Sequence, residues 1–333
     1  MNARVLVTGG AGFIGSHLCE RLLRRQDEVI CLDSFDDTYD PRIKRRNIEP
    51  FIGEGGFQLI EGDIRDGELL NNVGRNLPID MVVHLAALTG VRPSIGRPAL
   101  YSDVNLLGTT RLLEMVRDQG IRNFVFASSS SVYGQRDEVP FSESDPVDHP
   151  ISPYAATKIA GELVCHSFHS LFEIDITCLR YFTVYGPRQR PEMAIHRFTS
   201  LIDKDEPVTL FGDGTSKRDY TFVDDIVDGT LAALDNNHGY QIYNLGNHRM
   251  VSLSELIDGI GKALGKTPRI ERLPLQPGDV SITCADLTHS RAGLSYTPKI
   301  SLGAGLRRFV DWYHKESNSS FEDDSCSILE GTA

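Results

Sequence analysis

A tyrosine and a lysine four residues apart could together take a proton from a substrate hydroxyl. The segment Ser152–Lys158 predicts the start of a helix, because its proline suits the first helical turn. A spacing of four then places Tyr154 and Lys158 on one helical face. A phenol with a pKa of about 10 is a poor base at neutral pH, but a nearby ammonium group favours the phenolate and lowers that pKa. The pair is therefore a candidate for proton transfer, although the same spacing also arises by chance in many helices.

A run of four serines, Ser128 to Ser131, strengthens this interpretation. The run follows a predicted strand at 124–128. Ligands of open α/β sheets bind at the carboxyl ends of the strands, so a hydroxyl there can bridge a substrate oxygen and Tyr154. An isolated run of serines would be only a polar loop.

A glycine-rich turn, Thr8–Gly15, lies between the first predicted strand and the first predicted helix. Its glycines let backbone amides approach a pyrophosphate, and the helix N-terminus faces that anion. Asp33 ends the next strand at about the expected spacing of 20 residues, where a carboxylate binds ribose hydroxyls and repels a 2′-phosphate. The sequence therefore predicts NAD rather than NADP, and the positive nicotinamide ring would also favour a phenolate at Tyr154. Asp63 is a second candidate at the adenine end, or else a helix cap.

The elements that must position these residues alternate between strands and helices in the first half of the chain. A helix is predicted at Ile14–Arg25. Such alternation predicts parallel strands joined by right-handed crossovers, hence an α/β fold with a doubly wound (Rossmann) sheet. The predicted strands are Arg4–Thr8, Val29–Leu32, Phe57–Ile60, Met81–Leu85, Phe124–Ser128 and Ile176–Arg180.

After about residue 180 the pattern loosens, and proline and glycine separate short segments. We expect residues 1–180 to form the cofactor-binding domain, to which the chain returns at about 219–247. Residues 181–218 and 248–316 are expected to form a smaller mixed α/β lobe that binds substrate. Residues 317–333 are rich in Ser, Glu and Asp and are predicted to be disordered.

Composition excludes several classes of partner. The formal net charge of −12 argues against nucleic acid and against an anionic membrane surface. No apolar run approaches the roughly 20 residues that span a bilayer, and no signal-peptide pattern is present. The six cysteines are scattered without metal-ligand spacing, which predicts reduced thiols, no metal site and a cytoplasmic protein.

The three motifs, in this order and spacing, resemble one superfamily over about residues 3–315. The chain is similar to the extended short-chain dehydrogenase/reductases, in the nucleotide-sugar epimerase and dehydratase branch. The resemblance implies that Ser129, four residues before Tyr133, is a catalytic hydroxyl, with Tyr154 the base and Lys158 its partner. It also implies a bound NAD. The implied cofactor contacts are Gly9, Gly12, Phe13, Ile14, Gly15, Asp33, Asp63, Ile64, Ala86 and Lys158.

Dehydratases of this branch carry Asp-Glu where this chain has Ser129-Ser130, so elimination of water is not expected. Segments 32–41, 84–95 and 180–191 resemble instead the UDP-glucuronate 4-epimerases, which implies a UDP-sugar substrate oxidised at C4. A hexuronate needs hydrogen-bond donors around C6. The candidate donors are Ser130, Ser131, Thr183, Arg92 and Arg190, of which the two arginines could instead bind the diphosphate or lie on the surface.

Two further segments resemble nucleotide contacts of the same family. Segment 212–220 places Arg218 towards the UDP, and segment 277–280 places Asp279 towards its ribose. UDP-glucose 4-epimerases typically have arginine where this chain has Gln276, which weakens a galactose-type assignment. Two predicted helices, 100–119 and 154–170, correspond to those that form a four-helix interface in relatives, and so imply a homodimer.

Other functions stay open at this point. A UDP-glucose or UDP-N-acetylglucosamine 4-epimerase, or a UDP-glucuronate decarboxylase, shares the Tyr-x-x-x-Lys pair, so the pair alone does not decide between them. A non-catalytic NAD-binding protein is disfavoured because Ser129, Tyr154 and Lys158 are all present.

Overall fold

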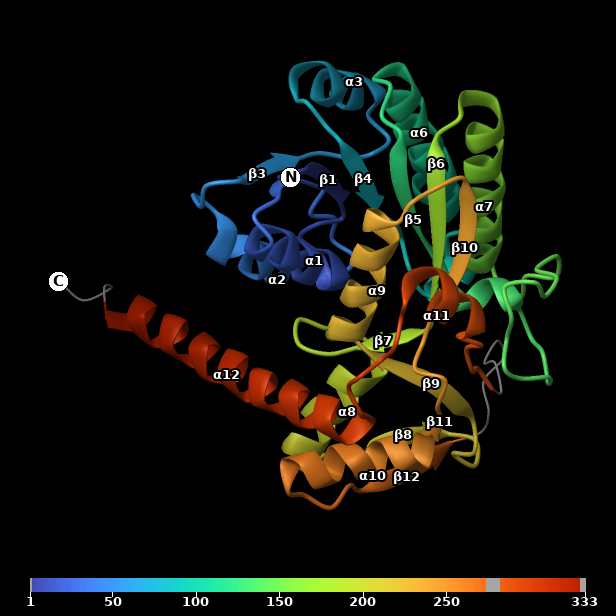
Figure 1. Ribbon diagram of the computed structural model, residues 1–333. Coiled ribbons are helices and arrows are strands. Elements are labelled where there is room, and N and C mark those ends of the chain that lie inside the picture. Colours follow the sequence, from blue (N-terminus) through green and yellow to red (C-terminus); the bar gives the residue numbers. More distant parts are fainter. Residues whose placement is uncertain (1, 274–281, 330–333) are drawn as a thin grey trace.

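The computed structural model describes residues 2–273 and 282–329. Seven strands form one sheet in the order β10-β6-β5-β4-β1-β2-β3, and every neighbouring pair is parallel. The predicted doubly wound sheet is confirmed, with most strands within one residue of their expected bounds (Figure 1). The strands are β1 (Arg4–Thr8), β2 (Glu28–Asp33), β3 (Phe57–Glu61), β4 (Met81–His84), β5 (Asn123–Ser129), β6 (Asp175–Tyr181) and β10 (Tyr240–Leu245).

Helices cover both faces of this sheet because alternate side chains of each strand point to opposite sides. In β1, Val5 and Val7 pack into one apolar core, while Leu6 packs into a second core. The first core lies under α1 (Phe13–Arg24) and α9 (Val223–Asp235). The second lies under α3, α6 and α7. The other helices of the larger domain are α2 (Pro41–Ile48), α3 (Gly67–Asn76), α4 (Val91–Gly96), α5 (Pro98–Ser102), α6 (Gly108–Asp118) and α7 (Pro153–Phe172). Short helical turns lie at Glu49–Phe51, Asp103–Leu107 and Ser130–Tyr133.

The smaller lobe contains two small sheets and three helices, below the large sheet in Figure 1. One sheet has the order β11-β9-β7 and the other pairs β12 with β8. Its strands are β7 (Thr183–Tyr185), β8 (Val208–Phe211), β9 (Lys217–Phe222), β11 (Met250–Ser252) and β12 (Ile270–Leu273), and its helices are α8 (Ala194–Asp203), α10 (Leu253–Leu264) and the first turns of α12 (Leu302–Leu329). Helix α11 (Thr288–Leu294) packs beside β10.

The chain returns to the large sheet slightly later than the sequence predicted. Strand β9 pairs with β7 and β11 in the small lobe, so the return begins with α9 at Val223 rather than at about residue 219. A short apolar strand has the same hydrophobic pattern whether it belongs to the large sheet or to a small one, so the sequence does not show which sheet it joins.

The C-terminal segment also differs from expectation. Helix α12 continues to Leu329, through residues predicted to be disordered. Its first turns are anchored by the buried side chains of Leu306, Phe309 and Val310. Once a helix is nucleated, each further residue adds a hydrogen bond at little cost, which composition alone does not reveal. None of the helices within the described residues is long and apolar enough to cross a membrane.

Candidate active site

One cavity of about 710 Å³ lies at the carboxyl ends of the large-sheet strands and extends to the turn after β7. This is where an open α/β sheet binds its ligands. Most of the side chains selected from the sequence line it. They are Gly9, Gly12, Phe13, Ile14, Gly15, Asp33, Asp63, Ile64, Ala86, Ser129, Ser130, Ser131, Tyr154, Lys158, Thr183 and Arg190.

The glycine-rich turn forms one end of the cavity. Gly9 has a φ of +70°, and a Cβ there would lie 2.7 Å from the amide nitrogen of Ala86. A Cβ on Gly15 would lie 2.1 Å from the carbonyl oxygen of Gly9, so both positions require glycine. Gly12 is the N-cap of α1 and brings no side chain to the first amides of that helix. This cradle fits a pyrophosphate on a helix N-terminus.

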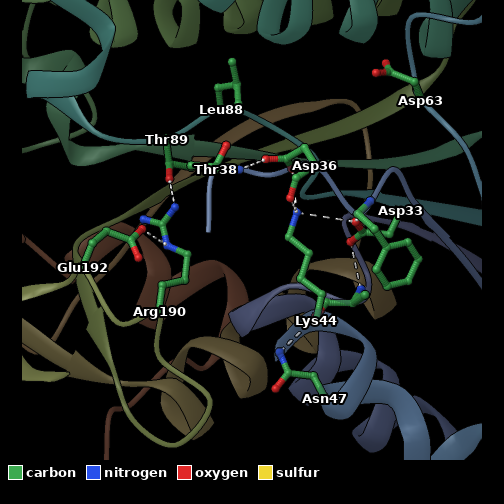
Figure 2. Close-up of polar contacts among 12 residues, drawn as sticks. Asp33, Asp36, Thr38, Lys44, Asn47, Asp63, Leu88, Thr89, Arg190 and Glu192 are labelled. Carbon is green, nitrogen blue, oxygen red and sulfur yellow. Dashed lines mark hydrogen bonds and ion pairs between the residues drawn. The ribbon is translucent and has the colours of Figure 1, made fainter. Parts of the chain in front are cut away.

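Asp33, at the end of β2, is held in place by two backbone amides. Its carboxylate accepts hydrogen bonds from the backbone amides of Ala11 (3.1 Å) and Phe35 (2.9 Å). Burial raises the pKa of Asp33, and the charge of Lys44 is the largest opposing influence. The Lys44 ammonium, itself buried, lies 3.9 Å from Asp33 and 2.6 Å from Asp36 (Figure 2).

Lys44 and Asp36 were not selected from the sequence. Helix α2 carries no recognised motif, and its position beside the glycine turn depends on tertiary contacts such as the Asn47 side chain donating to the carbonyl of Ala11 (3.1 Å). Asp63 lies further along this end of the cavity, where it pairs with Arg65 at 2.7 Å. That pair lowers the pKa of Asp63.

The serine–tyrosine–lysine group lines the same cavity. Ser152 caps α7 by accepting a hydrogen bond from the amide of Ala155 (3.1 Å), which fixes the helix start just before Tyr154. Burial raises the pKa of Tyr154, while the hydrogen bond from Ser129 and then the charge of Arg190 oppose that rise. Arg190 is therefore a charge that favours the phenolate and that the sequence did not assign to this role.

Lys158 lies one turn further along α7 and is buried. Its ammonium donates to the carbonyl oxygen of Ala127 at 2.7 Å and lies 4.9 Å from the centre of the Phe126 ring. Burial lowers the pKa of Lys158 to about 8. Ser129, at the end of β5, accepts a hydrogen bond from the amide of Ser131 (3.2 Å), so the serine run folds into a tight turn facing the cavity.

A buried ionic network lies behind this group. Glu162, the next residue on the Tyr154 and Lys158 face of α7, accepts hydrogen bonds from Ser128 (2.5 Å) and from two nitrogens of Arg180 (3.0 and 2.8 Å). It ties α7 to β5 and β6. Sequence reasoning missed Glu162, although its i, i+4, i+8 spacing from Tyr154 was a usable signal.

Arg190 is a charged side chain that lines the cavity. It lies in the turn between β7 and α8, donates to the Thr89 hydroxyl at 2.6 Å and pairs with Glu192 at 3.2 Å (Figure 2). Thr183, at the start of β7, lines the same region with Ser130. Thr89 and Glu192 were not selected from the sequence: Thr89 lies within segment 84–95, but no spacing singles it out there, and Glu192 lies just after segment 180–191.

Two selected residues, Arg92 and Arg218, are described by the structure but do not line this cavity. Arg92 is exposed on α4 and is not among the cavity-lining residues. Arg218 lies on β9, where it donates to the carbonyl of Lys217 (3.0 Å), also outside the cavity lining. Asp279 and Gln276 lie outside the described residues.

Comparison with known proteins agrees with this geometry. Residues 5–246 match the model of the NAD dependent epimerase/dehydratase family. The UDP-glucuronate 4-epimerase of Thermodesulfobacterium geofontis is 41% identical, over 92% of this chain and 95% of that protein. A crystal structure of UDP-glucuronic acid 4-epimerase from Bacillus cereus, in complex with UDP-glucuronic acid and NAD, has a TM-score of 0.87 at 39% identity and covers 94% of this chain and 99% of that one.

A second crystal structure, UDP-glucose 4-epimerase from Thermotoga maritima with UDP-glucose, has a TM-score of 0.86 at 32% identity and covers 94% of this chain and 99% of that one. The two folds are thus equally similar to this chain, and the fold does not select the sugar. The match over most of the chain, together with the glycine cradle and the Ser129–Tyr154–Lys158 group, leads to one conclusion: the chain belongs to the NAD-dependent epimerase/dehydratase family.

Proposed function

We propose that the protein is a UDP-glucuronate 4-epimerase that interconverts UDP-glucuronate and UDP-galacturonate through a transient 4-keto sugar, using tightly bound NAD. The observation that carries the proposal is the arrangement of one cavity. The glycine cradle, the serine–tyrosine–lysine group, Thr183 and Arg190 all line this cavity. The similar proteins named as UDP-glucuronate 4-epimerases support this choice of sugar.

The residues present fit the cofactor. The Gly9–Gly15 turn and the start of α1 would hold the pyrophosphate, and Asp33 would accept hydrogen bonds from the adenosine ribose. Asp63, Ile64 and Ala86 lie along the same wall of the cavity. When bound, NAD accepts a hydride from the sugar and later gives one back.

The side chains of the chain itself manage the proton. Tyr154 takes the proton of the C4 hydroxyl, and Ser129 holds that oxygen through its own hydroxyl. Lys158 and Arg190 supply positive charge that favours the phenolate. After the 4-keto sugar turns about its link to the diphosphate, C4 would present its opposite face for the returning hydride, and Tyr154 returns the proton to the C4 oxygen. Arg218 and Asp279 are proposed UDP contacts, which would hold the nucleotide while the sugar moves.

A hexuronate brings a specific hazard at the keto stage. A 4-keto uronate is a β-keto acid and loses carbon dioxide when the bond to its carboxylate stands perpendicular to the carbonyl plane. The hydroxyls of Ser130, Ser131 and Thr183 and the charge of Arg190 surround the sugar end and would hold the carboxylate out of that geometry. These groups favour epimerisation over decarboxylation.

Incubation of the purified protein with UDP-glucuronate, followed by proton NMR, tests this proposal. We expect UDP-galacturonate. A UDP-pentose product would instead identify a decarboxylase, and turnover of UDP-glucose alone would identify a hexose epimerase. Absence of any turnover would leave an NAD-binding protein without this activity.

Cofactor selection gives a separate prediction. Asp33→Ser removes the carboxylate that repels a 2′-phosphate and leaves the Lys44 ammonium at that position. Loss of a charged hydrogen bond of about 1.5–3 kcal/mol should weaken NAD binding roughly tenfold or more, while NADP binding improves. The ratio of the activities with added NAD and NADP measures the effect. In the Asp33→Ser background, Lys44→Met should abolish the gain with NADP, and an unchanged ratio in Asp33→Ser would refute the role given to this carboxylate.

We propose a homodimer in which α6 and α7 meet their symmetry copies. Leu163 on α7 is 66% exposed and Leu171 is 72% exposed, while Leu107, just before α6, is 40% exposed. Large apolar side chains that remain exposed on neighbouring helices are typical of a surface that a second subunit covers. Sedimentation equilibrium should give twice the chain mass, and a single-chain mass at micromolar concentration would contradict the proposal.

We also propose that the protein works in the cytoplasm. Among the residues whose side chains the structure describes, the cysteines are free and buried, as expected of a reducing compartment; they are Cys19, Cys31, Cys165, Cys178 and Cys284. Fractionation of cells that express the protein tests this, and recovery in an oxidising compartment would overturn it.

A further inference from the structure

The contact between Arg190 and Thr89 joins the two lobes across the cavity. Arg190 belongs to the turn that follows β7 in the smaller lobe, and Thr89 belongs to the loop that follows β4 in the larger domain. The guanidinium donates to the Thr89 hydroxyl at 2.6 Å (Figure 2). Both residues line the cavity, so this hydrogen bond determines where a positive charge lies at its sugar end.

Thr89 is itself fixed in place. Its carbonyl oxygen accepts a hydrogen bond from the Tyr101 hydroxyl at 2.7 Å. The Tyr101 ring is buried and packs edge-on against the Tyr154 ring, with centroids 6.3 Å apart and planes at 84°. The preceding residue, Leu88, exchanges backbone hydrogen bonds with the Asn105 side chain at 2.8 and 2.9 Å. The backbone of Thr89 is therefore held in place through Tyr101, whose ring packs on Tyr154.

Glu192 offers Arg190 a competing partner. Its carboxylate lies 3.2 Å from Arg190 Nε, but its side chain is 48% exposed, whereas that of Arg190 is 20% exposed. An ion pair with a half-exposed partner is screened by water and holds its geometry weakly. Without the Thr89 hydroxyl, the Glu192 carboxylate would draw the guanidinium away from the Thr89 side of the cavity.

We propose that Thr89 is a positioning residue for the epimerase reaction: its hydroxyl holds Arg190 over the cavity, so that the guanidinium acts on the catalytic tyrosine as well as on the sugar. The proposal rests on the proposed function only in that Tyr154 serves as the base. It assigns to Thr89 a role in proton transfer that no motif of the sequence indicates.

The electrostatics of the cavity agree with this geometry. Arg190 lowers the pKa of three tyrosines that burial raises, namely Tyr39, Tyr101 and Tyr154. Around Tyr154, Ser129 from β5 forms a hydrogen bond with it, Arg190 from the β7–α8 turn lowers its pKa, the Tyr101 ring from α5 packs on its ring, and Lys158 on its own helix lines the same cavity. Burial raises the pKa of Tyr101, so this phenol stays neutral. A substitution at Thr89 would therefore act on Tyr154 by displacing the charge of Arg190.

The test is the pH dependence of kcat/KM for the holoenzyme. A positive charge favours phenolate, so displacing Arg190 should raise the pKa on which activity depends and move the acid limb of the profile to higher pH. We expect Thr89→Val, which keeps the shape and removes the hydroxyl, to shift that limb upward by about half a pH unit to one unit. Thr89→Ser should restore the wild-type position. Glu192→Gln should shift the limb in the opposite direction, because Arg190 then loses its competing anion.

Failure of this inference and failure of the proposed function are distinguishable. The wild type is assayed first with UDP-glucuronate and UDP-glucose, and the profiles use whichever sugar it turns over. If the protein turns over neither sugar, ultraviolet difference titration of the holoenzyme measures the ionisation of the Tyr154 phenol directly. The titration of Tyr154→Phe is subtracted to remove the signal of the other tyrosines. Coincident midpoints for wild type and Thr89→Val, or equal shifts for Thr89→Val and Thr89→Ser, would overturn the role of the hydroxyl.

Discussion

Replacing Tyr154 by phenylalanine should lower turnover by several orders of magnitude while NAD remains bound. The substitution removes the group that accepts the C4 proton, and a positioned general base typically contributes about 10²–10⁴-fold. The phenylalanine ring keeps the edge-on packing against Tyr101, so the fold of the cavity should persist. Steady-state kinetics measure the loss, and the absorbance of cofactor released from the denatured protein measures the NAD content.

Tyr185→Phe is a matched control for this experiment. Tyr185 is also buried, but its hydroxyl donates to the carbonyl of Leu302 (3.3 Å) and is not among the groups that line the cavity. Removal of the Tyr185 hydroxyl should leave turnover near normal. Near-normal activity in Tyr154→Phe, or an equal loss in both variants, would refute Tyr154 as the base.

Replacing Arg180 by methionine should destabilise the fold by about 3–5 kcal/mol, the usual cost of leaving one member of a buried ion pair unpaired. The side chains of Arg180 and Glu162 are only 2% and 5% exposed, and Arg180 Nη2 lies 2.8 Å from the Glu162 carboxylate. The remaining carboxylate would keep only its hydrogen bond from Ser128 on that side. Urea unfolding of the holoenzyme, compared with wild type, measures the change in the free energy of unfolding.

A double variant separates the unpaired charge from the lost packing. Arg180→Met combined with Glu162→Gln removes both charges and keeps a hydrogen-bonding amide beside Ser128. We expect it to be more stable than Arg180→Met alone, because the uncompensated buried anion is gone. A loss of less than about 1 kcal/mol in Arg180→Met, the range of an exposed pair, would contradict the structural importance assigned to this ion pair.

Local sequence signals predicted much of the fold and of the catalytic group. The β1 to β6 strands are short apolar runs, and their hydrophobic pattern located them to within about one residue. Gly9 and Gly15 were predictable because close backbone approach leaves no room for a Cβ. Tyr154 and Lys158 were predictable because helical spacing alone puts them on one face.

Residues that reach the site through tertiary contacts were not predictable in this way. Lys44 lies on a helix without a motif, and its approach to Asp33 depends on how α2 packs beside the glycine turn. Thr89 meets Arg190 across 101 positions of sequence, and no local pattern relates them. Arg92 has a local motif but projects from α4 outside the cavity lining, because a motif gives the position of a residue along the chain and not its final direction.

The central claim is that the hydrogen taken from C4 is returned to C4 of the same sugar. Incubation of the holoenzyme with UDP-glucuronate deuterated at C4 tests it most directly. Proton NMR and mass spectrometry should show UDP-galacturonate that retains the deuterium at C4, with the label at the same level in the recovered UDP-glucuronate. Exchange of the C4 label with solvent, or formation of a UDP-pentose with release of carbon dioxide, would contradict the account.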